Sequence, residues 1–343
     1  MIITKENKHR ILFTLTTFIL CLFISYRNIP SFFDPNDTGR YIDFLHAYCG
    51  DEFNALAEIK KSEYYILNLF STPACLINSD RLFLFEIAFL IPTAFVFLIN
   101  WKKNTIVLAA SGFLNMSSFE FMMNAFRQEL GFFFFLYAIA TVQKKPYIGI
   151  SMGILAMYTH SSFGYYLPLL FFILQFNFLK KMQFNFLKKI HIYIFLITTL
   201  LFFSLLSEII NFFNLNDDFF LFSEGYSEKS NNFFVLYMIS PLYWIYGARH
   251  FIDKEYITYN EKLTIIYSTI LIVACLFYFP LIMYRFVFIS IVLQIFLIAL
   301  SEKYTTKSIK YIFMGNFAHL IILVFISDGY REFYINSFIG KIS

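Results

Sequence analysis

The chain has 343 residues, of which 59% are hydrophobic and only 15% are charged, and its formal net charge is +4. Its mean hydropathy is +0.63. These values exclude a soluble globular protein, because a soluble domain of this length could not cover so much apolar surface. We expect an all-α, polytopic membrane helix bundle, since a backbone in hydrocarbon must satisfy its own hydrogen bonds.

Eleven apolar runs are predicted as transmembrane helices of one polytopic membrane domain, residues 1–343. Each crossing needs about 20 apolar residues, or fewer where neighbouring helices shelter its ends. The first run has a basic start but no small-residue cleavage site after Ser25, so we interpret it as a retained helix and not as a signal peptide. The predicted spans are 11–26, 82–99, 105–122, 128–142, 147–159, 165–178, 191–210, 233–247, 263–279, 282–300 and 309–326.

The distribution of basic residues predicts the orientation of the chain. If the N-terminus is cytoplasmic, 17 of the 27 basic residues fall in cytoplasmic segments, as the positive-inside rule requires. Residues 27–81 then form a large outer loop with amphipathic stretches suited to interfacial helices. Residues 211–232 form a second outer loop, interpreted as a solvated acidic segment. Cys49 and Cys75 both lie in the first loop, and the sequence leaves open whether they pair.

Arginine is concentrated on the predicted outer side of the membrane. Six arginines lie there, whereas the cytoplasmic segments contain 15 lysines and two arginines. The planar guanidinium group binds phosphate through two parallel hydrogen bonds, so this distribution indicates anion binding. Arg127 and Arg285 are the strongest candidates because each borders an apolar run, where a charge without a role is costly. The alternative is that each arginine only marks the end of a helix.

Two short motifs carry a family resemblance: Asn124-Ala-Phe-Arg127-Gln128 and Tyr158-Thr-His160-Ser-Ser. They resemble the EpsG-like branch of the Wzy-type polysaccharide polymerases, in which an N-x-x-R-Q step and an H-x-S step recur at this separation. The resemblance covers the whole chain in size and layout.

Two further segments are similar to motifs of that family. Ser25-Tyr-Arg27-Asn, followed by Asn36-Asp37 and Tyr41, is similar to the family's entry into the first outer loop. The glycine expected before the aspartate is absent, so Asp34 and Asp37 are alternative acidic positions. Tyr284-Arg285 is similar to the family's late arginine.

The resemblance implies an enzyme of the bacterial cytoplasmic membrane whose active site faces outside. Such an enzyme joins polyprenyl-diphosphate-linked oligosaccharide units into a surface polysaccharide by glycosyl transfer. A flippase and a chain-length regulator are candidate partners. No cofactor, metal or nucleic acid is expected, and the six histidines and four cysteines show no metal-ligand spacing.

In this interpretation Arg127, Arg285 and Arg27 bind the departing diphosphate, whose developing charge must be stabilised. His160 is the predicted general base, because an imidazole with an ordinary pKa of about 6.5 accepts a proton near neutral pH, and Asp37 is the alternative base. The simpler interpretation of His160 is a polar helix cap bonded to the neighbouring serines. The predicted supporting residues are Gln128, Asn124 and Tyr41.

Two other classes of protein remain alternatives. A lipid-linked oligosaccharide flippase should carry charges near the bilayer midplane and internal repeats. Few charges lie inside the predicted spans, and the sequence has no evident repeat. A membrane O-acyltransferase needs a histidine near the cytoplasmic side, for which His250 beside Arg249 is a candidate. The charged residues 253–255, however, are typical of an ordinary cytoplasmic loop.

Overall fold

The computed structural model describes residues 5–27, 37–49, 65–102, 104–123, 125–181, 197, 232–278 and 280–326. Within these ranges every regular element is a helix, as the sequence predicts. The helices are α1 (Lys5–Ser25), α2 (Asp37–Tyr48), α4 (Tyr65–Leu76), α5 (Asp80–Ala88), α6 (Leu90–Leu98), α7 (Thr105–Phe113), α8 (Met116–Met123), α9 (Phe126–Thr141), α10 (Pro146–Thr159), the 3-10 helix η1 (Ser161–Tyr166), α11 (Leu167–Lys181), α15 (Asn232–Ile252), α16 (Tyr259–Tyr278), α17 (Pro280–Ser301) and α18 (Thr306–Ile326).

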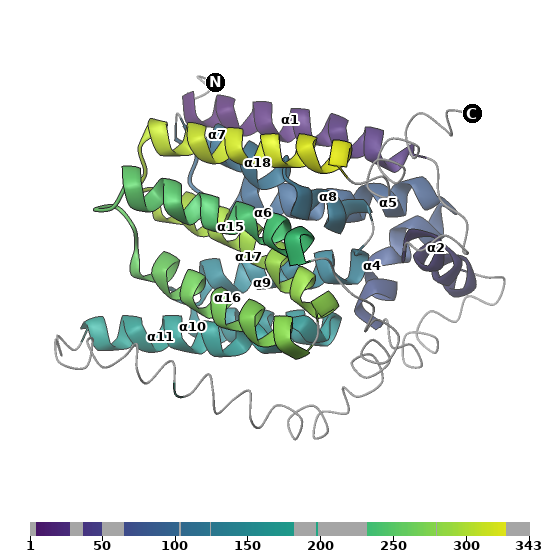
Figure 1. Ribbon diagram of the computed structural model, residues 1–343. Helices are drawn as coiled ribbons and strands as arrows, with labels where there is room; N and C mark the ends of the chain where they lie inside the picture. The colour runs from purple at the N-terminus through teal and green to yellow at the C-terminus, as the bar shows by residue number, and fades with distance from the viewer. Residues whose placement is uncertain are drawn as a thin grey trace.

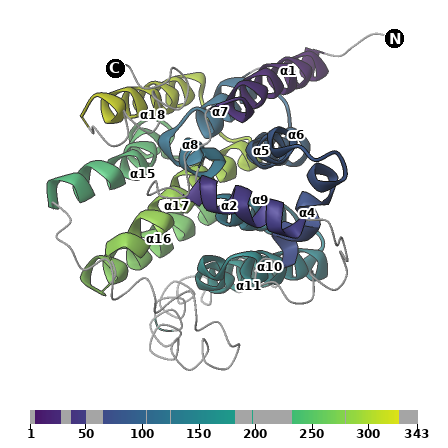
Figure 2. The same cartoon turned by 90° about the vertical axis from the view of Figure 1, so that its right-hand side faces the viewer.

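Most of the long helices run in a common direction and form a bundle around α17 (Figure 1). Every residue from Phe286 to Ala299 of α17 is buried. A helix that is apolar on all sides is expected in the interior of a bundle, which explains the central place of α17. α1, α7 and α18 form one edge of the bundle, and α10 and α11 form the opposite edge (Figures 1 and 2).

α1 and α18 expose large apolar side chains on their outer faces, among them Ile19 and Phe23 of α1 and Met314 and Phe325 of α18. Extended apolar surface of this kind is typical of contact with lipid or another apolar partner. In the part of the chain that the structure describes, three helices are long and apolar enough to cross a membrane, and up to five spans result if each of two bent helix pairs counts as one. These features are those of a helical membrane protein.

The prediction of eleven full spans is therefore not met in the described part of the chain. Ten of the predicted runs coincide with helices, and the run 191–210 lies outside the described residues except at position 197. α9, α10 and α11 have 16, 14 and 15 residues, fewer than the about 20 that a full crossing needs. The runs 82–99 and 105–122 are each broken into two helices, bent by 40° and 53°.

The bend between α7 and α8 has an identifiable cause in Asn115. Its amide nitrogen donates to the carbonyls of Ser111 and Gly112 at 2.9 and 2.8 Å, near the end of α7. Its amide oxygen accepts from the backbone N–H of Ser118 at 3.1 Å, in the first turn of α8. One side chain thus caps both helices, and the chain changes direction without leaving these backbone groups unpaired.

Among the described residues, the connections predicted to be cytoplasmic gather at one end of the bundle, which we call the basic end (residues 100–102, 104–105, 144–145, 249–262 and 302–310) (Figure 1). Lys102 pairs with Glu302 there. Asn104 donates to Thr306 at 2.7 Å. Amphipathic α2 crosses the opposite end, which we call the outer end (Figure 2). The grouping of charges at one end agrees with the positive-inside pattern of the sequence.

Cys49 and Cys75 form a disulfide, so the structure pairs the two cysteines that the sequence left open. The bond ties the residue after α2 to α4, at the outer end. Structural disulfides persist in oxidising compartments and are rare in the cytosol. The disulfide therefore supports an extracytoplasmic position for the outer end.

Candidate functional site

The start of α9 connects three neighbouring helices at the outer end. Successive residues of a helix point about 100° apart, so adjacent side chains reach different neighbours. Arg127 Nε donates to the Thr159 carbonyl of α10 at 3.3 Å, and Gln128 Nε2 donates to the Arg285 carbonyl of α17 at 3.5 Å. Glu129 is fully buried, and α9 also packs against α6. α9 is thus joined to α10, α17 and α6.

The turn after α10 lies close to α9 because of a glycine. Phe163 of η1 stacks on Phe132 with 6.1 Å between ring centroids and lies 5.7 Å from the ring of Phe135. A Cβ atom at Gly131 would lie 2.7 Å from Phe163 Cε2. Any larger residue at position 131 would push η1 away from α9. This close approach brings His160, the first residue of the turn, toward Arg127.

η1 also fixes the start of α17 beside the same turn. The Tyr166 hydroxyl donates to the Phe286 carbonyl at 3.2 Å, and it lies 3.0 Å from Ser290 Oγ. The ring of Tyr165 packs on the ring of Phe286 at 5.2 Å. Arg285, the residue before Phe286, is thereby held close enough for its charge to act on His160. The structure thus brings together Arg127, His160 and Arg285.

In this group the side chain of His160 caps the 3-10 helix η1. Its Nδ1 accepts from the backbone N–H of Ser162 at 3.2 Å, so the neutral ring carries its proton on Nε2. Burial, and next the positive charges of Arg285 and Arg127, lower the pKa of His160 well below its usual value. The bond to Ser162 is the one expected of a polar helix cap, the simpler interpretation of His160, and the role of general base stays a prediction. The bond to Ser162 favours a neutral Nε2–H donor over a proton acceptor.

Arg27 has a different place from the one predicted. Its side chain is buried, and its guanidinium donates to the carbonyls of Ile24 and Met123, at 3.0 Å each, and to Thr38 Oγ1 at 3.4 Å. The Thr38 hydroxyl also donates to the Met123 carbonyl. These contacts join the end of α1, the start of α2 and the end of α8. They correct the prediction of a diphosphate ligand to that of a structural clamp.

The remaining predicted residues lie along α2 and the α8–α9 break. Tyr41 is buried and stacks on the ring of Phe126, with 5.2 Å between centroids. Asp37 is the first residue of α2, next to Thr38. The side chain of Asp37, together with Asp34 and Asn124, lies outside the described residues. Tyr41 therefore supports the site by holding α2 against the start of α9.

Sequence reasoning missed the contributions of Thr38 and Glu129. It also counted Arg81 among the six outer arginines whose distribution indicates anion binding. Arg81 Nη1 donates to the carbonyls of Ser25 and Arg27 at 2.9 and 2.6 Å, so this outer arginine caps the end of α1. Glu129 carried a usable signal: an acidic residue inside the apolar run that begins at residue 128. Thr38 carried none, because its role depends on a carbonyl 85 positions away.

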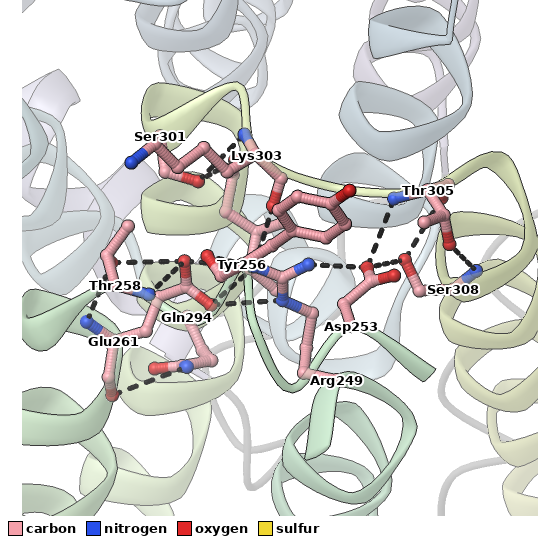
Figure 3. Close-up of polar contacts among 11 residues, drawn as sticks. Arg249, Asp253, Tyr256, Thr258, Glu261, Gln294, Ser301, Lys303, Thr305 and Ser308 are labelled. Atoms are coloured by element: carbon pink, nitrogen blue, oxygen red, sulfur yellow. Dashed lines mark hydrogen bonds and ion pairs between the residues drawn. The ribbon is translucent and has the colours of Figure 1, made fainter. Parts of the chain in front are cut away.

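Arg249 and His250, the residues considered for an acyltransferase, have different surroundings in the structure. Arg249 is fully buried and donates to Asp253, Glu261 and the carbonyls of Tyr256 and Lys303 (Figure 3). His250 is exposed at the basic end. Residue 253 therefore belongs to a buried ionic cluster, where the sequence predicted an ordinary loop. The sequence did contain a signal for this cluster, because one arginine and three carboxylates lie within the 13 residues 249–261.

Comparison of the chain with protein-family models, with curated proteins and with solved structures finds no match. A fold alone does not define an activity, so the function has to be argued from the chemistry of the site. At the outer end that chemistry consists of two arginines and a neutral histidine held together by four helical elements.

Proposed function

We propose that the chain is a polymerase that joins polyprenyl-diphosphate-linked oligosaccharide units at the outer face of the bacterial cytoplasmic membrane. The observation that carries this proposal is the meeting of Arg127, His160 and Arg285 at the outer end. Two guanidinium groups and a neutral imidazole N–H form a donor set suited to the oxygens of a diphosphate. The resemblance of the two motifs to the Wzy-type polymerases supports the same reaction.

In the proposed reaction, a hydroxyl of one lipid-linked unit attacks the anomeric carbon of another. The bond from that carbon to the diphosphate oxygen breaks, and the lipid diphosphate leaves with the electron pair. Arg127, Arg285 and the His160 Nε2–H stabilise the charge that develops on the departing oxygens. The hydroxyl proton passes to Asp37 at the start of α2, the residue that the sequence offered as the alternative base. Arg27 is a positioning residue, because it clamps α2 to the α8–α9 break.

The direct test is a reaction with purified protein in detergent. Lipid-linked repeat units alone should yield a ladder of repeat lengths, without nucleotide sugar, acyl-CoA or added metal. A requirement for acyl-CoA would favour the acyltransferase alternative. Movement of lipid-linked units across vesicles without any ladder would favour the flippase alternative. No ladder from folded wild-type protein supplied with its native substrate would remove the polymerase proposal.

The role of His160 is tested by comparing glutamine with alanine. Glutamine places an N–H donor near the position of Nε2 but cannot take up a proton at neutral pH. We expect His160→Gln to keep its rate within about tenfold of wild type and His160→Ala to lose about 10²-fold or more, the usual effect of removing one such donor. The rate of ladder formation measures both. Equal loss in the two variants would restore His160 as the general base.

The pH profile gives a second measurement on the same residue. Because the pKa of His160 is lowered, its protonation should leave kcat/KM of the free enzyme unchanged near pH 6.5. The bound diphosphate offsets the charges of both arginines, so any His160 limb in kcat should lie at higher pH than the corresponding limb in kcat/KM. A limb near 6.5 in kcat/KM that disappears in His160→Gln would contradict the assignment.

The proposed orientation predicts opposite labelling of the two ends. Ile77 is exposed in the turn between α4 and α5, and Lys144 is exposed in the turn between α9 and α10. Single cysteines at these positions should react with an impermeant thiol reagent from outside only at position 77. Cys49 and Cys75 are held in a disulfide and Cys21 is buried, so Cys275→Ser suffices as a background. Labelling of position 144 alone would reverse the orientation.

A further inference from the structure

The cluster around Arg249 at the basic end carries one more negative charge than positive charge. Arg249 is 0% exposed, Asp253 1% and Glu261 0%. Arg249 forms ion pairs with Asp253 Oδ2 at 2.6 Å and with Glu261 Oε2 at 3.0 Å. Three uncharged residues complete the cluster: Gln294 of α17, Thr305 just before α18, and Ser308 in α18 (Figure 3). A buried excess charge is costly unless a cation compensates it.

Two oxygens of the cluster lack a hydrogen-bond partner among the described residues. They are Oδ1 of Asp253 and Oε1 of Gln294, and both side chains are at least 99% buried. Asp253 Oδ2 accepts from three donors, and both oxygens of Glu261 accept from Arg249. A hard metal ion needs about six oxygen ligands, many more than two. A proton needs only one oxygen.

We propose that this buried cluster is a proton-binding site, in which Asp253 and Glu261 together hold one proton that balances the excess negative charge. The proton would be released as the pH rises, and the remaining net negative charge would weaken the clamp between α15, α16, α17 and α18. The site is independent of the proposed polymerase function, because it lies at the basic end, whereas the start of α9 and the end of α10, which carry Arg127 and His160, lie at the outer end.

The direction of the pH effect follows from the carboxyl groups. Glu261 precedes the apolar run of α16, and burial raises its pKa above the ordinary value of 4.5 against the opposing effect of Arg249. In the unfolded chain the pKa returns to its ordinary value, so the folded protein binds more protons in the interval between the two values. The stabilisation is complete below the ordinary value and is lost as the pH rises through the raised value.

Asp253→Asn is the decisive variant, because it removes the negative charge of the side chain and keeps an oxygen that can accept the same hydrogen bonds. The amide oxygen can take the place of Oδ2, which accepts from Arg249 Nη1, the Thr305 N–H and the Ser308 hydroxyl. Thermal unfolding of the full chain in detergent should be followed from about pH 4.5 to about pH 9. Between the ordinary and the raised pKa, where the folded protein still holds the proton that the unfolded chain has released, the folded-to-unfolded ratio of the wild type should fall by up to about tenfold per pH unit. In Asp253→Asn this fall should disappear.

Glu302→Gln is the matched control, because Glu302 belongs to an ion pair with Lys102 at the same end. Its removal should leave the fall with rising pH unchanged. Ser308→Ala is the second variant: it deletes one donor to Asp253 Oδ2, so the excess negative charge of the cluster is compensated less well and the fall should extend to higher pH. Infrared spectra of the folded wild type should show the carbonyl stretch of a protonated carboxyl that vanishes as the pH is raised.

Each of these measurements can overturn the proposal. A wild-type stability that does not fall with rising pH would overturn it. A fall that persists unchanged in Asp253→Asn would also overturn it, as would the absence of a titrating carboxyl band. If Asp253→Asn does not accumulate, Ser308→Ala and the wild-type infrared titration still decide the question.

Discussion

Replacement of Arg127 by lysine is expected to abolish long polymer while the protein still accumulates in the membrane. Lysine keeps the positive charge and can still donate one hydrogen bond to the Thr159 carbonyl, so the end of α10 stays capped. It lacks the planar fork that binds two phosphate oxygens at once. We expect ladder formation to fall by at least about 10²-fold, the usual effect of removing a donor from a developing charge.

Arg81→Lys is the matched control for this variant. Arg81 also lies at the outer end, and one nitrogen, Nη1, makes both of its hydrogen bonds to backbone carbonyls. A lysine ammonium can supply both bonds, so polymer length and yield should stay close to wild type. Polymer yield on gels and protein amount on immunoblots measure the two variants together. Normal polymer from Arg127→Lys would reduce Arg127 to a helix cap.

Replacement of Arg249 by methionine is expected to destabilise the folded protein by about 3–5 kcal/mol, because it leaves Asp253 and Glu261 buried without their counter-charge. The variant should accumulate poorly or unfold at a much lower temperature in detergent. Arg10→Met is a control for loss of an arginine: Arg10 contacts the ring of Phe97 at 5.2 Å, and its loss should cost less than about 1 kcal/mol.

A combined variant separates lost charge balance from lost packing. Arg249→Met together with Asp253→Asn and Glu261→Gln has no buried charge left in the cluster. It should recover part of the stability lost in Arg249→Met alone, because replacing a whole buried ion pair is often close to neutral. A single Arg249→Met variant as stable as the wild type would show that the cluster contributes little to the fold.

Several features of the protein followed from the sequence alone. Apolar composition determined that the chain is helical and membrane-associated, since hydrocarbon leaves the backbone no other partner than itself. The placement of lysines determined which connections gather at the basic end. The two motifs around Arg127 and His160 marked the residues that meet at the outer end. Each of these signals is local, because it depends on residue type and spacing along one segment.

Only the tertiary structure decided which of the polar residues are engaged by the protein itself. Arg27, Arg81 and Arg249 look like exposed or boundary arginines in the sequence, but carbonyls and carboxylates from distant segments bind their donors. The hydrogen bond from Ser162, the burial of the ring and the charges of two arginines favour a neutral His160 with its proton on Nε2, which the sequence did not indicate. The number of full spans likewise depended on the tertiary structure, because it breaks two of the apolar runs into bent helix pairs. Hydrogen bonds and electrostatic effects act between groups that are close in space, and a sequence does not show which distant groups will be close.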